Sequence, residues 1–326
     1  MTLSCSVTSL TLAAVVCAAA CPSSGPSPVV PATPPGEPAP IPIGDGDLDA
    51  FAARESEVAL CLHGAGPRLL LVALPAGPAT DLAWPLGPDD RCQRLAVGDD
   101  AVCIASYDGG VACAPRDGGP DVVSVAVAGP PTGLAWDGAS FWAATDGEGL
   151  WRFTSSGDAE RVLDLPDVMS GLVAGPFGLA WGSAGEFTWR TRTLRRGAGD
   201  PTWIRPPLPV NVRCEDEAEV CEWVSTAIGW FRGKVWFAAA NAPAPLYTWN
   251  PDEGQWREYH VDGEVLVGPA GAWAVSVGGA VQRCPANRNR FEPAGVALDP
   301  GEALGAAAGG LWAAGHGVLR LVVAAP

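Results

Sequence analysis

Lysine is almost absent from the chain, since Lys234 is the only one, and no basic residue of either kind precedes Arg54. Charged residues make up 17% of the sequence, and the excess of acidic side chains gives a formal net charge of −16. A surface with this balance repels a phosphate backbone, so nucleic acid is excluded as an expected partner. Hydrophobic residues make up 48%, which is enough apolar surface for a large buried core.

Helical periodicity is also missing, because outside the N-terminal segment no stretch keeps a helical period over ten residues. Glycine and proline are instead abundant, at 41 and 32 residues. In an apolar chain this combination predicts many turns that join short strands.

A short apolar segment runs from Leu10 to Ala20. It is too short to span a bilayer as a mature helix, but it fits the hydrophobic part of a signal peptide. Small residues directly before Cys21 resemble a bacterial lipobox, in which the cysteine is lipidated after cleavage. We therefore expect a signal peptide over residues 1–20 and a lipid on Cys21, with a plain secretory signal cleaved nearby as the alternative.

A proline-rich stretch follows this junction, with nine prolines between residues 22 and 43. Such a stretch forms extended, polyproline-like conformations and serves as a semi-rigid spacer. Residues 21–44 are thus predicted to be a tether that holds the rest of the chain off a membrane. The expected location is the bacterial outer membrane or cell surface as a lipoprotein, and otherwise the periplasm or the medium.

Seven short phrases recur along the remaining sequence, each ending in cysteine or tryptophan. The marked positions are Cys61, Cys103, Trp142, Trp189, Trp236, Trp273 and Trp312. Successive marks are 42, 39, 47, 47, 37 and 39 residues apart. A period near 40 suits the four-stranded blade of a β-propeller.

The sequence therefore predicts an all-β fold, with a single β-propeller over residues 45–326. Seven blades are expected, with six as the alternative if residues 185–226 form an insertion. The ring is expected to close by pairing of N- and C-terminal strands, with Leu48–Ala53 supplying an outer strand to the last blade. The marked residues are expected on one face of their sheets, buried against the neighbouring blade.

The clearest blade pattern covers Gly133 to Pro166, and Leu246 to Trp256 reads as a second strand–turn–strand unit. These phrases resemble blades of the broad propeller group that includes NHL repeats, virginiamycin B lyase and the gluconolactonase-like lactonases. The resemblance implies the architecture. It also implies, for the enzymes of that group, a divalent metal held in the central channel by His, Glu, Asn or Asp side chains.

Seven cysteines lie in the predicted propeller, and an exported domain permits disulfides. Cys103 and Cys113 flank a hairpin-turn signal at Asp108-Gly109, so they are predicted to face each other and to form a bridge. Cys214 and Cys221 bracket a short loop and are a second candidate pair. The pairing of the other three, Cys61, Cys92 and Cys284, stays open.

The loop around the second pair is the most charged stretch of the chain. Its acidic residues are Glu215, Asp216, Glu217, Glu219 and Glu222. This loop is either an interaction site for a cation or a basic partner, or a solvated part of an acidic surface. A smaller acidic stretch, Asp45 to Asp49, has the alternating acids of a calcium loop. It lacks the glycine that follows them and has Ser56 in place of the bidentate Glu, so it is taken as the end of the tether.

No complete catalytic motif or zinc spacing is present, and the three histidines fall in different predicted blades. We therefore expect a non-catalytic cell-envelope propeller that binds a protein, a glycan or a small ligand, without a cofactor. One alternative is a metal-assisted lyase or lactonase that uses a divalent cation in the channel, for which His260, Glu264 and Asn241 are the nearest candidates. A structural envelope protein is the other alternative.

Overall fold

A computed structural model describes residues 38–164, 168–184, 189–195, 202–204, 225–239, 245–261, 263–276, 278–285, 290–298 and 302–324. These residues contain strands and turns and no helix. None of them therefore belongs to a helix that could cross a bilayer. Predominance of strands follows from the short apolar runs and the frequent glycine turns of the sequence.

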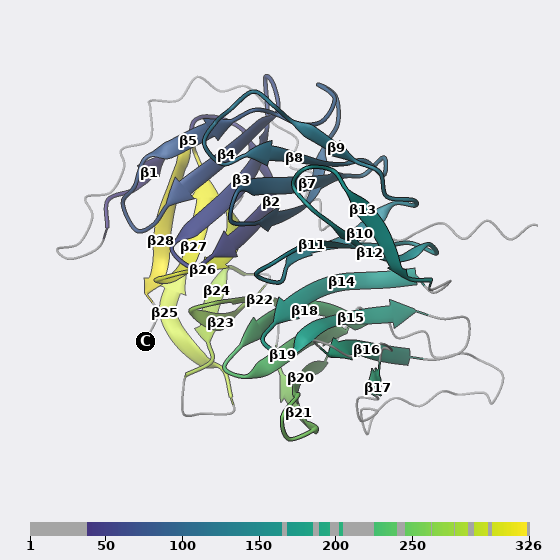
Figure 1. The fold of residues 1–326 in the computed structure, drawn as a ribbon. Coiled ribbons are helices and arrows are strands. Elements are labelled where there is room, and N and C mark those ends of the chain that lie inside the picture. The colour runs from purple at the N-terminus through teal and green to yellow at the C-terminus, as the bar shows by residue number, and fades with distance from the viewer. Residues whose placement is uncertain are drawn as a thin grey trace, which may run out of the picture. The chain divides into compact units, whose positions relative to one another are not determined.

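The described residues form seven antiparallel sheets of four strands each. We number these sheets as blades one to seven, in the chain order of their innermost strands (Figure 1).

The first three blades follow one another without interruption. Blade one consists of β2 (Asp47–Arg54), β3 (Glu57–His63), β4 (Arg68–Ala73) and β5 (Ala79–Leu82). Blade two consists of β6 (Cys92–Val97), β7 (Ala101–Ser106), β8 (Val111–Pro115) and β9 (Val123–Val125). Blade three consists of β10 (Pro131–Trp136), β11 (Phe141–Thr145), β12 (Gly149–Phe153) and β13 (Ala159–Leu163).

The next three blades repeat this order. Blade four consists of β14 (Val168–Gly175), β15 (Gly178–Ala184), β16 (Trp189–Arg195) and β17 (Thr202–Ile204). Blade five consists of β18 (Ser225–Phe231), β19 (Lys234–Ala239), β20 (Pro245–Asn250) and β21 (Gln255–His260). Blade six consists of β22 (Glu264–Gly268), β23 (Gly271–Val275), β24 (Ala280–Arg283) and β25 (Glu292–Ala297).

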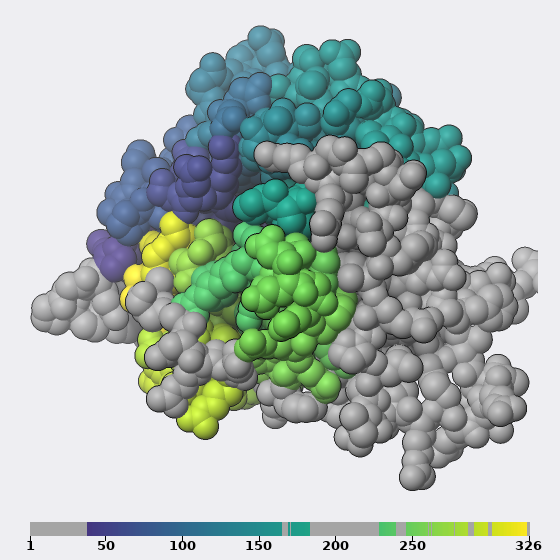
Figure 2. Space-filling view, turned by 60° about the horizontal axis from the view of Figure 1, so that its bottom comes forward, coloured from purple at the N-terminus to yellow at the C-terminus, as the bar shows by residue number. Residues whose placement is uncertain are grey.

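Blade seven joins the two ends of the described chain. Its strands are β26 (Ala303–Ala307), β27 (Gly310–Gly315), β28 (Val318–Ala324) and β1 (Ile41–Pro42). Strand β1 pairs with β28 through Ile41 and Leu319, and Figure 2 shows the purple N-terminal residues beside the yellow C-terminal strands. The innermost strands contact one another in chain order, and β26 contacts β2, so the ring is closed.

The closure corrects three expectations about the N-terminal part of the propeller. Leu48–Ala53 belongs to β2, the innermost strand of blade one, so it does not supply the outer strand of the last blade. That strand is β1, and the folded body therefore begins before residue 45. The acidic residues Asp47 and Asp49 likewise lie in β2 and not at the end of a tether. The short apolar segment from Leu48 to Ala53 fits either an innermost or an outer strand, so the pattern alone did not separate the two positions.

Six of the marked residues lie where the repeat placed them, in the second strand of their blades and buried. Trp142 packs with Leu179 of the next blade, and Trp312 packs with Val58 of blade one. The marked residues therefore lie on the face that meets the following blade. Large aromatic side chains there fill the widening space between radially arranged sheets.

The prediction is wrong for the remaining marked residue, Trp189. Trp189 begins β16, the third strand of blade four, where it pairs with Ala184. The second strand of this blade is β15, which carries Trp181. The phrase ending at Trp136, which reads like the one ending at Trp181, lies in an innermost strand instead. Nearly identical phrases thus occupy different strands, because the turn between Gly175 and Gly178 comes before the second phrase and not after it.

Candidate functional site

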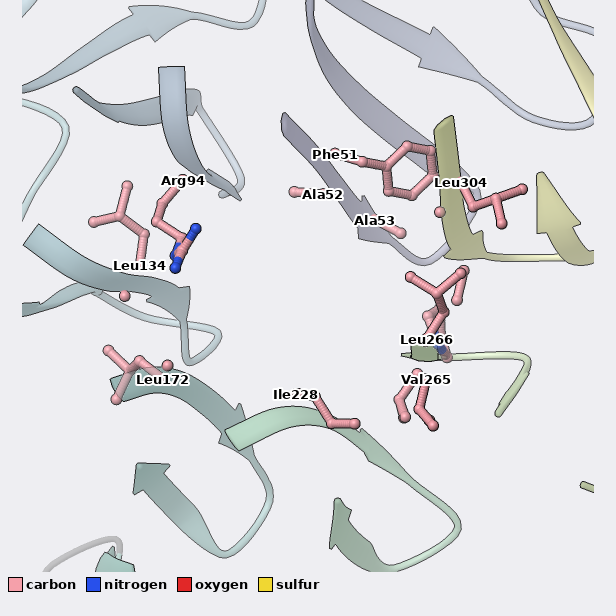
Figure 3. Close-up of a pocket in the computed structure, with 17 residues that line it drawn as sticks. Phe51, Ala52, Ala53, Arg94, Leu134, Leu172, Ile228, Val265, Leu266 and Leu304 are labelled. Carbon is pink, nitrogen blue, oxygen red and sulfur yellow. The ribbon is translucent and has the colours of Figure 1, made fainter. Parts of the chain in front are cut away.

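A cavity of about 400 Å³ lies at the centre of the ring (Figure 3). Every one of the seven innermost strands contributes to its wall. The lining residues are Phe51, Ala52, Ala53, Arg94, Gly133, Leu134, Gly171, Leu172, Ile228, Val265, Leu266, Val267, Gly268, Pro269, Leu304, Gly305 and Ala306. The volume of the cavity falls within the usual range of ligand pockets, about 300–1,000 Å³.

Glycines in the innermost strands let neighbouring blades approach at the channel wall. A Cβ atom added to Gly305 would lie 2.3 Å from the ring of Phe51, and one added to Gly133 would lie 2.7 Å from Cβ of Leu172. Larger side chains at these two positions would push the strands apart. The wall is therefore closely packed. Its side chains are apolar apart from Arg94, and polar groups make up the rest of its exposed surface.

Arg94 is the one charged side chain among the residues that line this cavity. Its Nε donates a hydrogen bond to the carbonyl oxygen of Thr132 on β10 at 3.1 Å, and its Nη1 donates to the carbonyl oxygen of Gln93 at 2.8 Å. Nη2 has no acceptor within the part of the chain that the structure describes. Figure 3 shows the guanidinium directed into the cavity.

Arg94 is half-buried at the channel wall. Burial lowers the pKa of Arg94 below its ordinary value, while the nearby Tyr107 acts in the opposite direction. The guanidinium nevertheless remains a cation at neutral pH, since arginine starts from so high a pKa. A positive charge thus points into the channel with three N–H groups still able to donate, two on Nη2 and one on Nη1.

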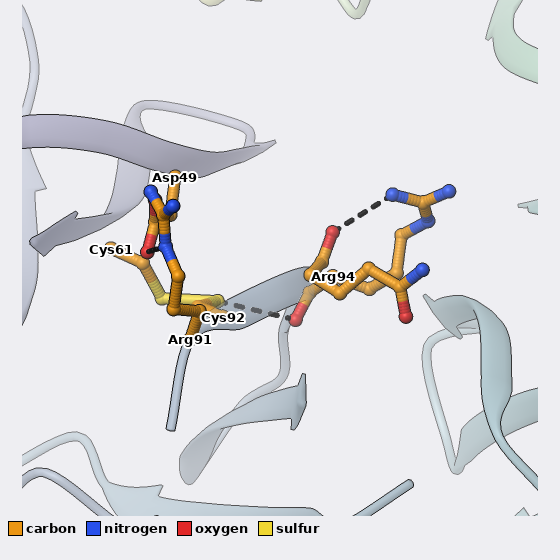
Figure 4. Close-up of a disulfide and its surroundings, with 6 residues drawn as sticks. Asp49, Cys61, Arg91, Cys92 and Arg94 are labelled. Atoms are coloured by element: carbon orange, nitrogen blue, oxygen red, sulfur yellow. Dashed lines mark hydrogen bonds and ion pairs between the residues drawn. A yellow bond between two sulfur atoms is a disulfide. The ribbon is translucent and has the colours of Figure 1, made fainter. Parts of the chain in front are cut away.

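Two cross-blade links hold the start of β6, and with it Arg94 (Figure 4). A disulfide joins Cys61 on β3 to Cys92, two residues before Arg94. An ion pair joins Arg91 to Asp49, whose side chain is 6% exposed. The hydrogen bond with Asp49 raises the pKa of Arg91, with burial as the opposing effect. Asp49 is one of the two acidic residues on the adjacent innermost strand, β2, and it is engaged by Arg91.

The disulfide between Cys103 and Cys113 is present, as the hairpin signal predicted. The two residues face each other in the pairing of β7 with β8, with a Cα–Cα distance of 4.0 Å. The open question about the other three cysteines is resolved by the Cys61–Cys92 bond. Cys284 is buried among the residues around Trp236, and burial raises the pKa of its thiol.

The remaining predicted site residues fall outside the described residues. They are the lipidation residue Cys21, the candidate pair Cys214 and Cys221, and the acidic loop Glu215, Asp216, Glu217, Glu219 and Glu222. The same holds for Asn241.

The histidines do not come together. His63 ends β3 in blade one, His260 ends β21 in blade five, and His316 lies in the turn between β27 and β28. Glu264 opens β22 in blade six. Within the described ranges, no group of three or more His, Cys, Asp or Glu side chains is placed to hold a metal ion.

Sequence reasoning did not find Arg94. It stands directly before a short apolar run, Leu95-Ala96-Val97, which predicts a strand but not the side of the ring that the strand faces. Arg68 opens β4 in a similar apolar run, yet it forms an ion pair with Asp81. The two arginines differ in the position of their strands, because Arg94 lies on the innermost strand of its blade and Arg68 on the third. The sequence would have shown this difference if every strand could have been assigned to its place in a blade.

Comparisons with known proteins support the architecture. No protein-family model and no curated protein matches the chain. Among solved structures, YCF48 bound to D1 peptide is similar over 87% of this chain and 96% of its own, with 14% identity and a TM-score of 0.60. The computationally designed Ika8 protein has 15% identity and a TM-score of 0.53, with 84% and 82% covered. Apo AztD from Citrobacter koseri has 12% identity and a TM-score of 0.52, with 82% and 79% covered. At these identities the likeness shows a shared propeller fold.

Proposed function

We propose that the protein is a non-catalytic binding module of the cell envelope whose ligand enters the central channel. The observation that carries this proposal is the channel itself, which combines an aliphatic wall from seven strands with one inward guanidinium. Apolar cavities with a few placed polar groups are the usual form of ligand sites. A rigid ring that presents such a cavity is ready to bind without rearrangement.

Two further observations support the setting. The two disulfides fit an oxidising compartment outside the cytoplasm, and the N-terminal segment reads as an export signal with a lipid on Cys21. The fold also serves binding elsewhere, since YCF48 is known in a complex with D1 peptide. The resemblance of the repeated phrases to NHL-type blades is part of the same proposal. The ligand would meet a propeller held outward from the membrane by the tether.

The test compares the ligands captured by the wild-type protein with those captured by a variant whose channel is filled by a larger side chain. Full-length protein and the Ile228→Trp variant are immobilised and exposed to envelope extract, and the retained peptides and small molecules are identified by mass spectrometry. Ile228 lines the cavity, so an indole there removes much of its volume. We expect species that the wild type retains and the variant does not. Identical sets from two equally folded proteins would refute a channel ligand.

A further inference from the structure

The charge and shape of the channel restrict the kind of ligand. Arg94 is half-buried, so its guanidinium is less fully solvated than one on the surface, and an anion that reaches it gains more than it would there. Asp49, on the neighbouring innermost strand, is already engaged by Arg91. Within the residues that the structure describes, no carboxylate is hydrogen-bonded to Arg94, so its charge is available to an anion that enters the channel.

The geometry of Arg94 favours a group with a single negative charge. Bonds to the carbonyl oxygens of Thr132 and Gln93 fix the orientation of the side chain and use the N–H of Nε and one N–H of Nη1. Both N–H groups of Nη2 and the other N–H of Nη1 remain for ligand oxygens, and no second cation lines the cavity within the described residues. A dianion such as a phosphate monoester would keep an excess charge in this apolar space, whereas a carboxylate would not.

The rest of the cavity favours a hydrocarbon. Leu134 and Leu172 lie next to Arg94 on the wall, and Ile228 and Leu266 continue the apolar surface around the ring (Figure 3). Each buried methylene on such a surface contributes favourably to binding.

We infer that the channel binds an aliphatic monocarboxylate, with its carboxylate on Nη2 of Arg94 and its hydrocarbon part along Leu134, Leu172 and Ile228. This inference rests on the proposed function, because it assigns the chemistry of the ligand for the same channel. The same chemistry occurs in a free aliphatic acid and in the C-terminal residue of a peptide that ends in leucine or valine. The residue that selects the acid is Arg94.

The experiment measures binding to the full-length protein by isothermal titration calorimetry. The probes are octanoate, its neutral counterpart octanamide, the dianion octyl phosphate and N-acetyl-valyl-leucine with a free or an amidated C-terminus. We expect one acid per chain, bound about tenfold or more tightly than its amide, as a charge-assisted hydrogen bond in a dry site provides. The ratio of octanoate to the peptide acid distinguishes the two sources.

Two substitutions that each remove one positive charge locate the effect. Arg94→Met should abolish the preference of the acid over its amide. Arg152→Met should leave that preference intact, because Arg152 is half exposed on β12 and pairs with Glu160. Circular dichroism checks that each variant is folded, and Arg94→Lys, which keeps the charge, serves if Arg94→Met does not fold. Lysine should retain part of the preference for the acid.

Several results would overturn the inference. They are equal binding of acid and amide, tighter binding of octyl phosphate, undetectable binding of both acids, or an unchanged preference after the charge of Arg94 is removed. Failure of the inference is distinguishable from failure of the proposed function. If Ile228→Trp removes a captured ligand that is not an acid, the channel still binds and only the assigned chemistry is wrong.

Discussion

Four tryptophans occupy equivalent places in four blades: Trp142, Trp236, Trp273 and Trp312. The residue opposite on the innermost strand is often small, as Ala135 is opposite Trp142 and Gly305 opposite Trp312. A small partner leaves room for the indole to reach the next blade. In blade four, the second strand has Ala180 on the face toward blade five, and the adjacent Trp181 lies on the face toward blade three. The repeated tryptophan was therefore predictable where the spacing was regular, and not in the one blade that departs from it.

Trp142 provides the clearest test of this interpretation. Its side chain is 7% exposed, and its Nε1 donates a hydrogen bond to Oδ2 of Asp137 at 2.9 Å. Trp142→Ala should lower the free energy of unfolding by about 3–5 kcal/mol, since it leaves a large cavity between blades three and four. Urea titration followed by fluorescence of the other tryptophans measures the change.

Trp256 provides the matched control. It lies on β21, the outermost strand of blade five, and is only partly buried. Trp256→Ala should cost clearly less than Trp142→Ala, although its ring lies 5.6 Å from that of Phe237. Equal losses from the two substitutions would contradict the assignment of Trp142 to a blade interface.

Tyr247 predicts how stability depends on alkaline pH. Burial raises the pKa of this tyrosine above its ordinary value of 10.0, and the charge of Glu258 adds to the effect. The folded state therefore keeps the phenol proton when the unfolded state loses it. The stability that Tyr247 contributes is complete below about pH 10 and is lost as the pH rises further.

The Tyr247→Phe variant should consequently lose less stability than the wild type between pH 10 and pH 11. Its hydroxyl has no hydrogen-bond partner among the described residues, so the variant should be no less stable at pH 7. Thermal melts at several pH values measure both effects. Tyr107→Phe, at a position that is 48% exposed, is the control, and an equal benefit from it would show that burial of Tyr247 is not the cause.

At the scale of strands, the two-residue strand β1 has an importance out of proportion to its length. Ile41 is 4% exposed and packs in the same cluster as Trp312 and Leu319. Its pairing gives blade seven a fourth strand and covers the edge of β28. The sequence predicted that the ends would pair, but it assigned the wrong segment. Three alternating residues in a proline-rich region, Ile41, Pro42 and Ile43, carry too little pattern to mark a strand.

Ile41→Asp should open this closure. A carboxylate at this position would be buried without a partner, and we expect a loss of about 2–5 kcal/mol in the free energy of unfolding. Hydrogen exchange should accelerate at Val318 and Leu319, which pair with β1. Pro42→Asp adds the same charge at an exposed neighbour and should change exchange little. If neither variant affects β28, the short strand does not secure the ring.

At the scale of the whole molecule, the fold and its candidate site were not equally predictable. Composition and a period near 40 residues were enough to indicate an all-β propeller, because each blade repeats one pattern. The channel could be recognised only from the folded ring, because Arg94, Leu134 and Ile228 are far apart in sequence and come together only when the blades surround a centre. One side chain from each of several blades leaves no local motif.

The proposed anchor is tested on the whole protein. Cys21→Ser should move the protein from the membrane fraction to the soluble fraction, because the lipid can no longer be attached. Cys17→Ser, four residues upstream, should leave the protein in the membrane fraction. Fractionation and immunoblotting measure both outcomes. A wild-type protein that is already soluble, or a Cys17→Ser variant that is released, would contradict lipidation at Cys21.

The pairing of β1 with β28 also determines the order of assembly during translation. Ile41 and Pro42 are among the first described residues to be synthesised, while their partners Val318 and Leu319 come after every other blade has been made. A growing chain can thus form blades one to six in turn, but it must wait for its last strands before the circle is complete. Until then both β1 and the open side of blade one lack their final neighbours. A chain that stops before β28 would thus leave an unfinished ring that quality-control systems recognise, and not a slightly shorter propeller.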